Sequence, residues 1–316
     1  MTAAVETMFY VKETPWHGLG VKLEEAPTVS EAIVAAGLDW TVGLKDLFTT
    51  DGLPVPAKAT YREIDGKVDI LGVVGPRYSP LQNASAFDWF QPFIDSGEVS
   101  LHTAGSLNEG CKVWVLAELN RSKSEIVKGD EIAKFVLLSN SHDGTTAIRV
   151  GYTPIRVVCA NTMAMAHSCK ESKLLRVRHT KSSATKLNDI RDIMNNINGE
   201  FEATAEQYKY LASKMFNSAD LVKYVKIILD IELSTPSSEI KTRTKNIMND
   251  ILSRVEGPKQ TMEGVNGTWW AAYNGVNEYL NYEKGRSANN RLDSLWFGLN
   301  ANSNKRAFDT ALALAS

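Results

Sequence analysis

The spacing of hydrophobic and polar positions changes once along the chain, close to residue 187. Before this point, over about residues 40–160, short apolar runs alternate with turn residues, which is typical of β-strands joined by hairpins. After it, apolar residues recur every three or four positions, which is the spacing of helices. We therefore predict an α+β protein. Residues 1–186 would form an α+β core whose mostly antiparallel sheet and hairpins are packed by helices, and residues 187–316 a helical region.

The segment Lys134–His167 shows the strand pattern most clearly. Two apolar runs flank a turn signal at residues 140–144, and an Asp-Gly pair between two strands predicts a hairpin. Asn161 and Thr162 are good N-caps and predict a helix that begins directly after them. We expect this unit to form the centre of the fold.

Local signals predict several further elements. The first 27 residues are too rich in proline and glycine for a helix and are expected to be irregular. Thr28 and Glu31 have the spacing of a capping box, which predicts a short helix. A second Asp-Gly pair, at residues 65–66, predicts another hairpin. Residues 121–130 are polar and are expected to be a connection that leads into the central unit.

Past residue 187 a narrow apolar seam predicts one long helix. Its apolar positions are Leu187, Ile190, Met194, Ile197, Phe201, Tyr208, Leu211 and Met215. A seam of nearly four heptads packs either on the protein's own core or on a second copy of the chain. Its regularity leads us to expect a homo-oligomer.

Composition places the chain among ordinary globular proteins. It has 316 residues, of which 43% are hydrophobic and 23% charged, and it contains no apolar run of the length that spans a membrane. The N-terminus lacks the features of a signal peptide, and three scattered cysteines suit reduced thiols. We therefore expect a cytoplasmic protein, without membrane contact.

Charge is distributed unevenly, although the net charge is only −2. A basic strip follows the central unit, and two arginines precede it in the strands. The candidate nucleic-acid-binding residues are Arg149, Arg156, Lys170, Lys173, Arg176, Arg178 and Lys181. Lysine and arginine on one strip bind phosphates and release counterions. The alternative is a solvated basic linker between the sheet and the helices.

Catalytic motifs are missing from the sequence. It has no phosphate-binding loop of the Gly-Lys-Ser/Thr type, no Cys-x-x-Cys pair and no Gly-x-Ser-x-Gly elbow, so no cofactor or metal is predicted. His142 and Asp143 are a possible acid–base pair, and Cys159 a possible nucleophile. We interpret the first two as turn residues and the cysteine as a buried thiol. Replacing His142 by alanine is then expected to cost within about 0.5 kcal/mol if the side chain is exposed.

Several short stretches together resemble one family across nearly the whole chain. They are residues 14–20, 71–74, Tyr78, 82–83, 103–107, Gly110, 140–144, 153–162, 178–180 and 267–269. The sequence resembles the DUF932 family of phage- and plasmid-encoded proteins, a domain of unknown function. The resemblance implies a gene from a mobile element. The order of elements is also similar to the core of Rad52-type single-strand annealing proteins, which phages often carry and which need no nucleotide.

These observations lead to a functional hypothesis. We predict that the protein binds single-stranded DNA without ATP and anneals complementary strands in phage recombination or replication, in the cytoplasm of the host. Its partners would be single-stranded DNA, further copies of itself, and a phage or host replication or recombination protein. One alternative is a host-takeover or defence-related protein that binds a protein partner and no DNA. Another is a nucleic-acid-processing enzyme centred on His142, Asp143 and Cys159.

Overall fold

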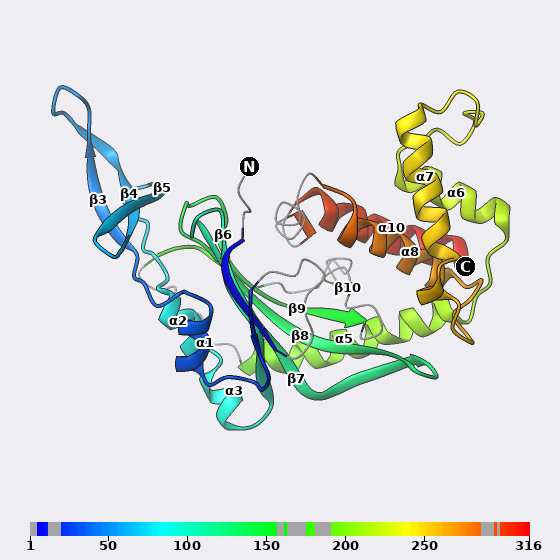
Figure 1. Ribbon diagram of the computed structural model, residues 1–316, viewed down its shortest axis with the longest axis horizontal. Helices are drawn as coiled ribbons and strands as arrows, with labels where there is room; N and C mark the ends of the chain where they lie inside the picture. Colours follow the sequence, from blue (N-terminus) through cyan, green and yellow to red (C-terminus); the bar gives the residue numbers. More distant parts are fainter. Residues whose placement is uncertain are drawn as a thin grey trace. The chain divides into compact units, whose positions relative to one another are not determined.

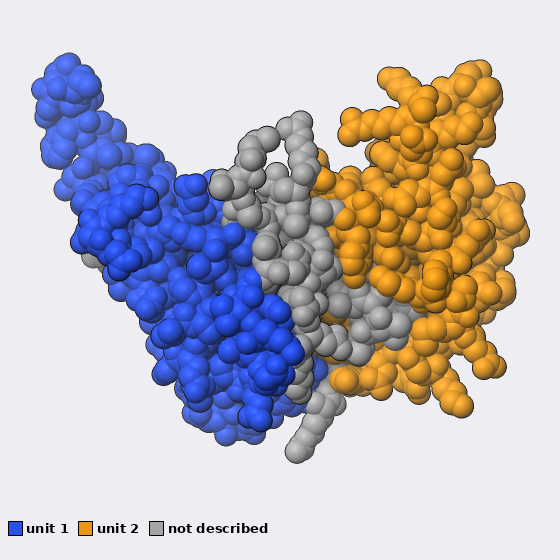
Figure 2. All heavy atoms as spheres, viewed as in Figure 1, with its two compact units in different colours: residues 1–121, 135–152, 173–197 blue, residues 122–134, 153–172, 198–316 orange. Residues whose placement is uncertain are grey.

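A computed structural model describes residues 5–11, 20–156, 161–162, 175–180, 191–285, 294–295 and 298–316. The chain divides into two compact units (Figure 2). Unit 1 comprises residues 1–121, 135–152 and 173–197, and unit 2 comprises residues 122–134, 153–172 and 198–316. Because both units combine segments from distant parts of the sequence, this grouping does not test a division at residue 187, which stays a prediction.

The large sheet of the described chain has eight strands. They are β1 (Val5–Val11), β2 (Val21–Leu23), β6 (Val99–Leu107), β7 (Lys112–Val127), β8 (Asp130–Ser141), β9 (Ile148–Arg156), β10 (Asn161–Thr162) and β11 (Leu175–Val177). The strand order is β10-β9-β8-β7-β6-β1-β2, and β11 pairs with β9 (Figure 1). Strands β1 and β2 are parallel, whereas β6 is antiparallel to both β1 and β7. The predicted α+β class with a mostly antiparallel sheet is confirmed.

Two segments differ from the sequence-based expectation. Residues 5–11 form strand β1 and are not irregular, because they pair with β6 and bury Phe9 completely. Residues 121–130 are not a simple connection. Strand β7 continues to Val127 and β8 begins at Asp130, so two hydrogen-bonded neighbours meet in a tight turn. A polar segment is stable as a strand here because its backbone groups are paired within the sheet.

A second sheet of three strands forms an arm of unit 1. Strands β3 (Gly43–Phe48), β4 (Pro54–Ile64) and β5 (Lys67–Val74) lie in that order and are antiparallel throughout (Figure 1). The hairpin predicted from the Asp-Gly pair joins β4 to β5, and both residues of the pair have the positive φ of such turns. The local turn signal therefore correctly located the hairpin at the end of this arm's two longest strands.

Short helices complete unit 1. They are α1 (Val29–Ala35), α2 (Asn83–Asp88) and α3 (Gln91–Asp95). The capping box at the start of α1 is confirmed: Thr28 Oγ1 accepts from the Glu31 backbone N–H at 3.3 Å, and Glu31 Oε2 accepts from the Thr28 backbone N–H at 2.9 Å. The residues expected to cap a helix after Thr162 form β10, and the segment that follows, 163–174, lies outside the described residues.

The C-terminal part of the chain is helical, as predicted. Its helices are α5 (Arg191–Ala212), α6 (Ser218–Ile228), α7 (Thr242–Val255), α8 (Trp269–Tyr282) and α10 (Leu299–Ala315), with a 3-10 turn η2 (Pro258–Gln260). Helix α8 is buried on most of its surface and carries Trp269, Trp270 and Tyr273 into the core of unit 2. In the part of the chain that the structure describes, no helix combines the length and apolar character needed to cross a membrane.

The described part of the apolar seam packs within unit 2, whereas the side chains of Leu187, Ile190, Met194 and Ile197 lie outside the described part of the chain. Phe201, Tyr208 and Leu211 are buried, and the Tyr208 ring lies 4.7 Å from Trp270 and 5.2 Å from Phe308 between ring centroids. Only the last seam residue with a described side chain, Met215, is 69% exposed. In the described half of the seam, the regular spacing is therefore explained by packing in the core of unit 2. The homo-oligomer stays a prediction, and it needs another surface.

Two glycines on helices of unit 2 offer a direct check of this packing. A Cβ added to Gly275 of α8 would lie 2.5 Å from Val255 Cγ2, whereas one added to Gly199 of α5 would have no neighbour within 4 Å. Gly275→Ala is expected to lower the free energy of unfolding by about 1–3 kcal/mol through overpacking. Gly199→Ala is expected to raise it by about 0.5–1 kcal/mol through helix propensity. Urea denaturation of the two variants checks both signs, and a stable Gly275→Ala would contradict the close approach of α7 and α8.

Candidate nucleic-acid interface

The edge of the large sheet brings two of the predicted DNA-binding arginines together. Strand β11 pairs antiparallel with β9, and Arg176 stands directly opposite Arg149. Residues directly opposite one another in such a pair point to the same face, with Cβ atoms about 4.5–5.5 Å apart. Two like charges at this spacing repel one another and favour an anion between or above them. Arg176 is exposed, whereas Arg149 is half-buried and its Nε is buried, so the side chain of Arg176 is the part of the pair that a phosphate group would reach first.

The structure locates the other candidate residues only in part. Arg178 follows β11 directly and is exposed. Arg156 ends β9, where its backbone pairs with Asn161, but its side chain is not described. Lys170, Lys173 and Lys181 lie outside the described residues.

An aromatic stack fixes the end of β11 to the loop that follows β5. The rings of Tyr78 and His179 are stacked, with centroids 4.6 Å apart and planes inclined by 25°. The Ser79 backbone N–H donates to the His179 carbonyl at 3.2 Å, and the Tyr78 hydroxyl donates to the Ser141 carbonyl at 2.8 Å. Burial, reinforced by the Asp143 charge, raises the pKa of Tyr78, so its hydroxyl stays protonated. The stack therefore holds the loop after β5 against the end of β11.

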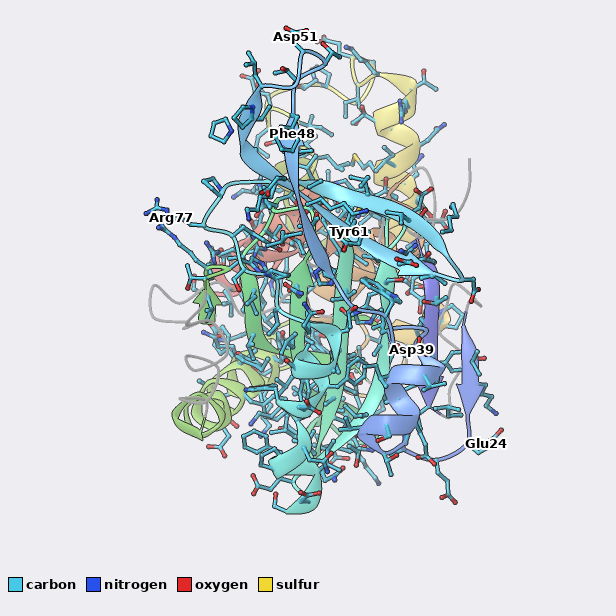
Figure 3. The ribbon with its side chains drawn as sticks, turned by 90° about the vertical axis from the view of Figure 1, so that its left-hand side faces the viewer. Glu24, Asp39, Phe48, Asp51, Tyr61 and Arg77 are labelled. Atoms are coloured by element: carbon cyan, nitrogen blue, oxygen red, sulfur yellow. The ribbon has the colours of Figure 1, made fainter. Side chains whose placement is uncertain are left out.

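The neighbours of this stack add a second pair of arginines. Arg77 precedes Tyr78, Arg178 precedes His179, and both arginines are exposed. Figure 3 shows Arg77 projecting away from the fold. Arg77 is therefore a further candidate beside Arg149, Arg176 and Arg178. Asp143 is a carboxylate whose charge acts on the pKa of both Tyr78 and His179. Sequence reasoning missed Arg77, because one arginine in a turn-rich loop carries no pattern of its own.

His142 is buried, contrary to an exposed position in the turn. Its Nε2 lies 3.0 Å from Asn83 Oδ1, and the Asn83 amide nitrogen donates to the carbonyls of Leu38 (3.1 Å) and Trp40 (3.3 Å). Since this orients Oδ1 as the acceptor, Nε2 carries the proton of a neutral ring. Burial, with smaller contributions from the charges of His179 and Arg62, lowers the pKa of His142 to about 3. A ring that is neutral and fully buried at neutral pH has a structural role and is poorly suited to proton transfer.

Asp143 and Gly144 fulfil the predicted turn roles. Asp143 Oδ1 accepts from the Thr145 backbone N–H at 2.9 Å and from the Thr145 hydroxyl at 2.6 Å. Gly144 has a φ of +74°, which side-chain-bearing residues resist. Cys159 lies outside the described residues, and among those described no group of three or more His, Cys, Asp or Glu side chains is arranged to hold a metal ion. The described contacts of His142 and Asp143 are therefore a buried hydrogen bond to Asn83 and the hydrogen bonds of the turn.

Comparison with known proteins identifies one family. The model of the family described as "Domain of unknown function (DUF932)" matches residues 70–296. The match includes the turn at residues 142–144, strands β6 to β11 and the helices α5, α6, α7 and α8 that follow. No curated protein and no solved structure matches the chain. The similarity of the element order to Rad52-type annealing proteins is therefore not confirmed.

Proposed function

The chain belongs to the DUF932 family, and we propose that it binds single-stranded DNA without ATP and promotes the annealing of complementary strands. The cross-strand pair of Arg149 and Arg176 is the observation that carries the proposal. Two guanidinium groups held at one spacing by the sheet form charge-assisted hydrogen bonds to phosphate oxygens. Arg77 and Arg178 extend the positive charge along the same loop and strand end.

Annealing requires only what such a surface provides. Two complementary strands repel one another through their phosphates, and bound arginines reduce that repulsion while the bases remain open to pairing. No step needs a nucleotide or a proton transfer. The proposal assigns no chemical role to His142, which is buried and neutral. Within this proposal, phage recombination or replication is the process served, with the host cytoplasm as the location.

An annealing assay tests the proposal. Two complementary oligonucleotides, one with a donor and one with an acceptor fluorophore, are mixed with the protein in the absence of nucleotide. We expect energy transfer to rise faster than without protein, and both strands to be recovered intact with or without Mg²⁺. A covalent change in either strand would favour the nucleic-acid-processing enzyme.

A protein-interaction role without DNA binding is the second candidate. It is favoured by the exposed apolar side chains of the arm, which include Phe48 and Leu53 close to its tip. Absence of both binding and annealing in the same assay, by a protein that is folded, would favour this candidate over the first.

A further inference from the structure

The two faces of the arm differ in their surroundings. One face packs within unit 1 and carries Thr60 and Arg62, both buried. Arg62 is paired on this face with Glu6 and Asp69. We call the opposite face the outer face. Its residues are identified from the alternation of side chains along each strand and from the strand register. Its side chains are those of Lys45, Tyr61, Glu63, Val68, Ile70 and Val73, together with Ala59, which is only 4% exposed.

The outer face exposes a row of aliphatic side chains on an edge strand. Val68, Ile70 and Val73 of β5 are 42%, 58% and 62% exposed. Strand β5 is the last strand of the three-stranded sheet. Edge strands of proteins that stay monomeric are usually protected by charged side chains or proline. Contiguous exposed apolar side chains of this kind mark interaction surfaces.

The centre of the outer face is flat and held in place. The Tyr61 ring lies over Gly43, where an added Cβ would stand 2.5 Å from the ring atoms. Lys45 Nζ lies 4.3 Å from the Tyr61 ring centroid, a cation–π contact that orients the ring further. Figure 3 shows Tyr61 in the middle of the arm, between the tip and the body of unit 1. A flat, ordered aromatic and aliphatic surface suits packing against another sheet.

The charges of the outer face are arranged so that the face complements itself. Lys45 lies in the row formed with Ala59 and Val73, whereas Glu63 lies in the row formed with Val68. The row of Tyr61 and Ile70 separates them, and successive rows are about 6.7 Å apart. A rotation of 180° about an axis parallel to the middle row exchanges the outer two. Lys45 of one copy then lies in the row of Glu63 of the other but one strand, about 4.8 Å, to its side, an offset that two long side chains span, and this happens twice. The valines and isoleucine of β5 face one another.

We propose that the outer face is the contact surface of a homodimer, in which two arms pack face to face about a two-fold axis. A closed two-fold contact uses the same patch on both copies, which is what the self-complementary charges provide. The seven side chains of the outer face are fewer than the roughly 20–30 residues that each partner contributes to a standard interface. The dimer is therefore expected to dissociate in the micromolar range. This interface is independent of the α5 seam and of DNA binding.

Removing apolar area is the first test, made on the full chain without DNA. Val73→Thr keeps the shape of a β-branched side chain and is compatible with a strand. Its matched control is Val34→Thr on α1, since both valines are 62% exposed. Sedimentation equilibrium across the micromolar range should show a monomer–dimer equilibrium whose dissociation constant rises about tenfold for Val73→Thr, because the substitution weakens the interface on both copies. The constant should not change for Val34→Thr.

Charge reversal is the second test and identifies the arrangement. Lys45→Glu and Glu63→Lys each place like charges opposite one another twice, so each variant should dimerise about tenfold more weakly. An equimolar mixture of the two variants pairs opposite charges again and should recover the wild-type dissociation constant. A monomeric wild type, or a dimer unaffected by Val73→Thr, would overturn the proposal. Charge variants that weaken nothing, or whose mixture fails to recover, would overturn the two-fold arrangement.

Discussion

His142→Ala is expected to lower the free energy of unfolding of unit 1 by about 3 kcal/mol at neutral pH. The substitution removes the hydrogen bond between Nε2 and Asn83 Oδ1 and leaves that oxygen buried without its donor. It also empties the space beside Trp40, whose ring packs edge-on against the imidazole at 5.5 Å. Sequence reasoning, which allowed for an exposed side chain, expected almost no cost.

The same residue should make stability depend on pH. Its pKa is about 3 in the folded protein and close to its ordinary value of 6.5 once unfolded. Between these values the unfolded chain binds a proton that the folded chain does not. The contribution of His142 is therefore complete above about pH 6.5 and falls by about 1.4 kcal/mol per pH unit as the pH decreases towards 3. His179, whose pKa burial also lowers, adds a change of the same sign.

Urea denaturation at several pH values between about 4 and 7 measures both effects. In His142→Ala the pH slope should be reduced to the part contributed by other groups whose pKa is lowered in the folded protein, among them His179, Glu31 and Asp69. Gly144→Val is the matched control, because it disturbs the same turn, where an added Cβ would lie 2.9 Å from Val74 Cγ1, without removing a titrating group. Its curve should be lower than that of the wild type and parallel to it. An alanine variant with wild-type stability and slope would show that the ring is not a buried neutral group.

Asp143 and His142 show which contacts could be predicted from the sequence and which could not. The Asp-Gly turn was predictable because its hydrogen bonds run between residues two apart in sequence. The burial of His142 was not, since its partner Asn83 is 59 residues away and no local pattern links them. The pairing of Arg149 with Arg176 likewise depends on the register of two strands separated by a long segment. A register of this kind is decided by the whole sheet.

The apolar seam of α5 shows that a sequence pattern can predict an apolar face without identifying what packs against it. Its spacing correctly predicted a long helix with one apolar face. It could not distinguish the protein's own aromatic core, where Tyr208 meets Trp270 and Phe308, from a second copy. The sequence did not indicate that the aliphatic row of β5 could form an interface, because Val68, Ile70 and Val73 are ordinary strand residues. Only the strand order shows that they lie on an edge strand, where they are exposed.

Replacing Arg149, Arg176 and Arg178 together by alanine should weaken binding to single-stranded DNA by a factor of about 100 or more at low salt. Each arginine that no longer binds a phosphate also no longer displaces a counterion from the DNA. The slope of log affinity against log salt should flatten by about 0.7 for each phosphate-binding arginine removed, so by about 2 for all three. Arg243→Ala with Lys245→Ala, two exposed basic residues on α7, is the control for a change in net charge alone. That variant should keep the wild-type slope.

A fluorescence-anisotropy titration of a labelled single-stranded oligonucleotide, repeated over a series of salt concentrations, tests the central claim most directly. For the wild-type protein the account predicts saturable binding whose affinity falls linearly on logarithmic axes as salt rises. For the triple arginine variant it predicts weaker binding with a flatter slope, and for the α7 control the wild-type line. A triple variant that is folded and binds with the wild-type affinity and slope, or a wild-type protein that shows no binding even at the lowest salt, would contradict it.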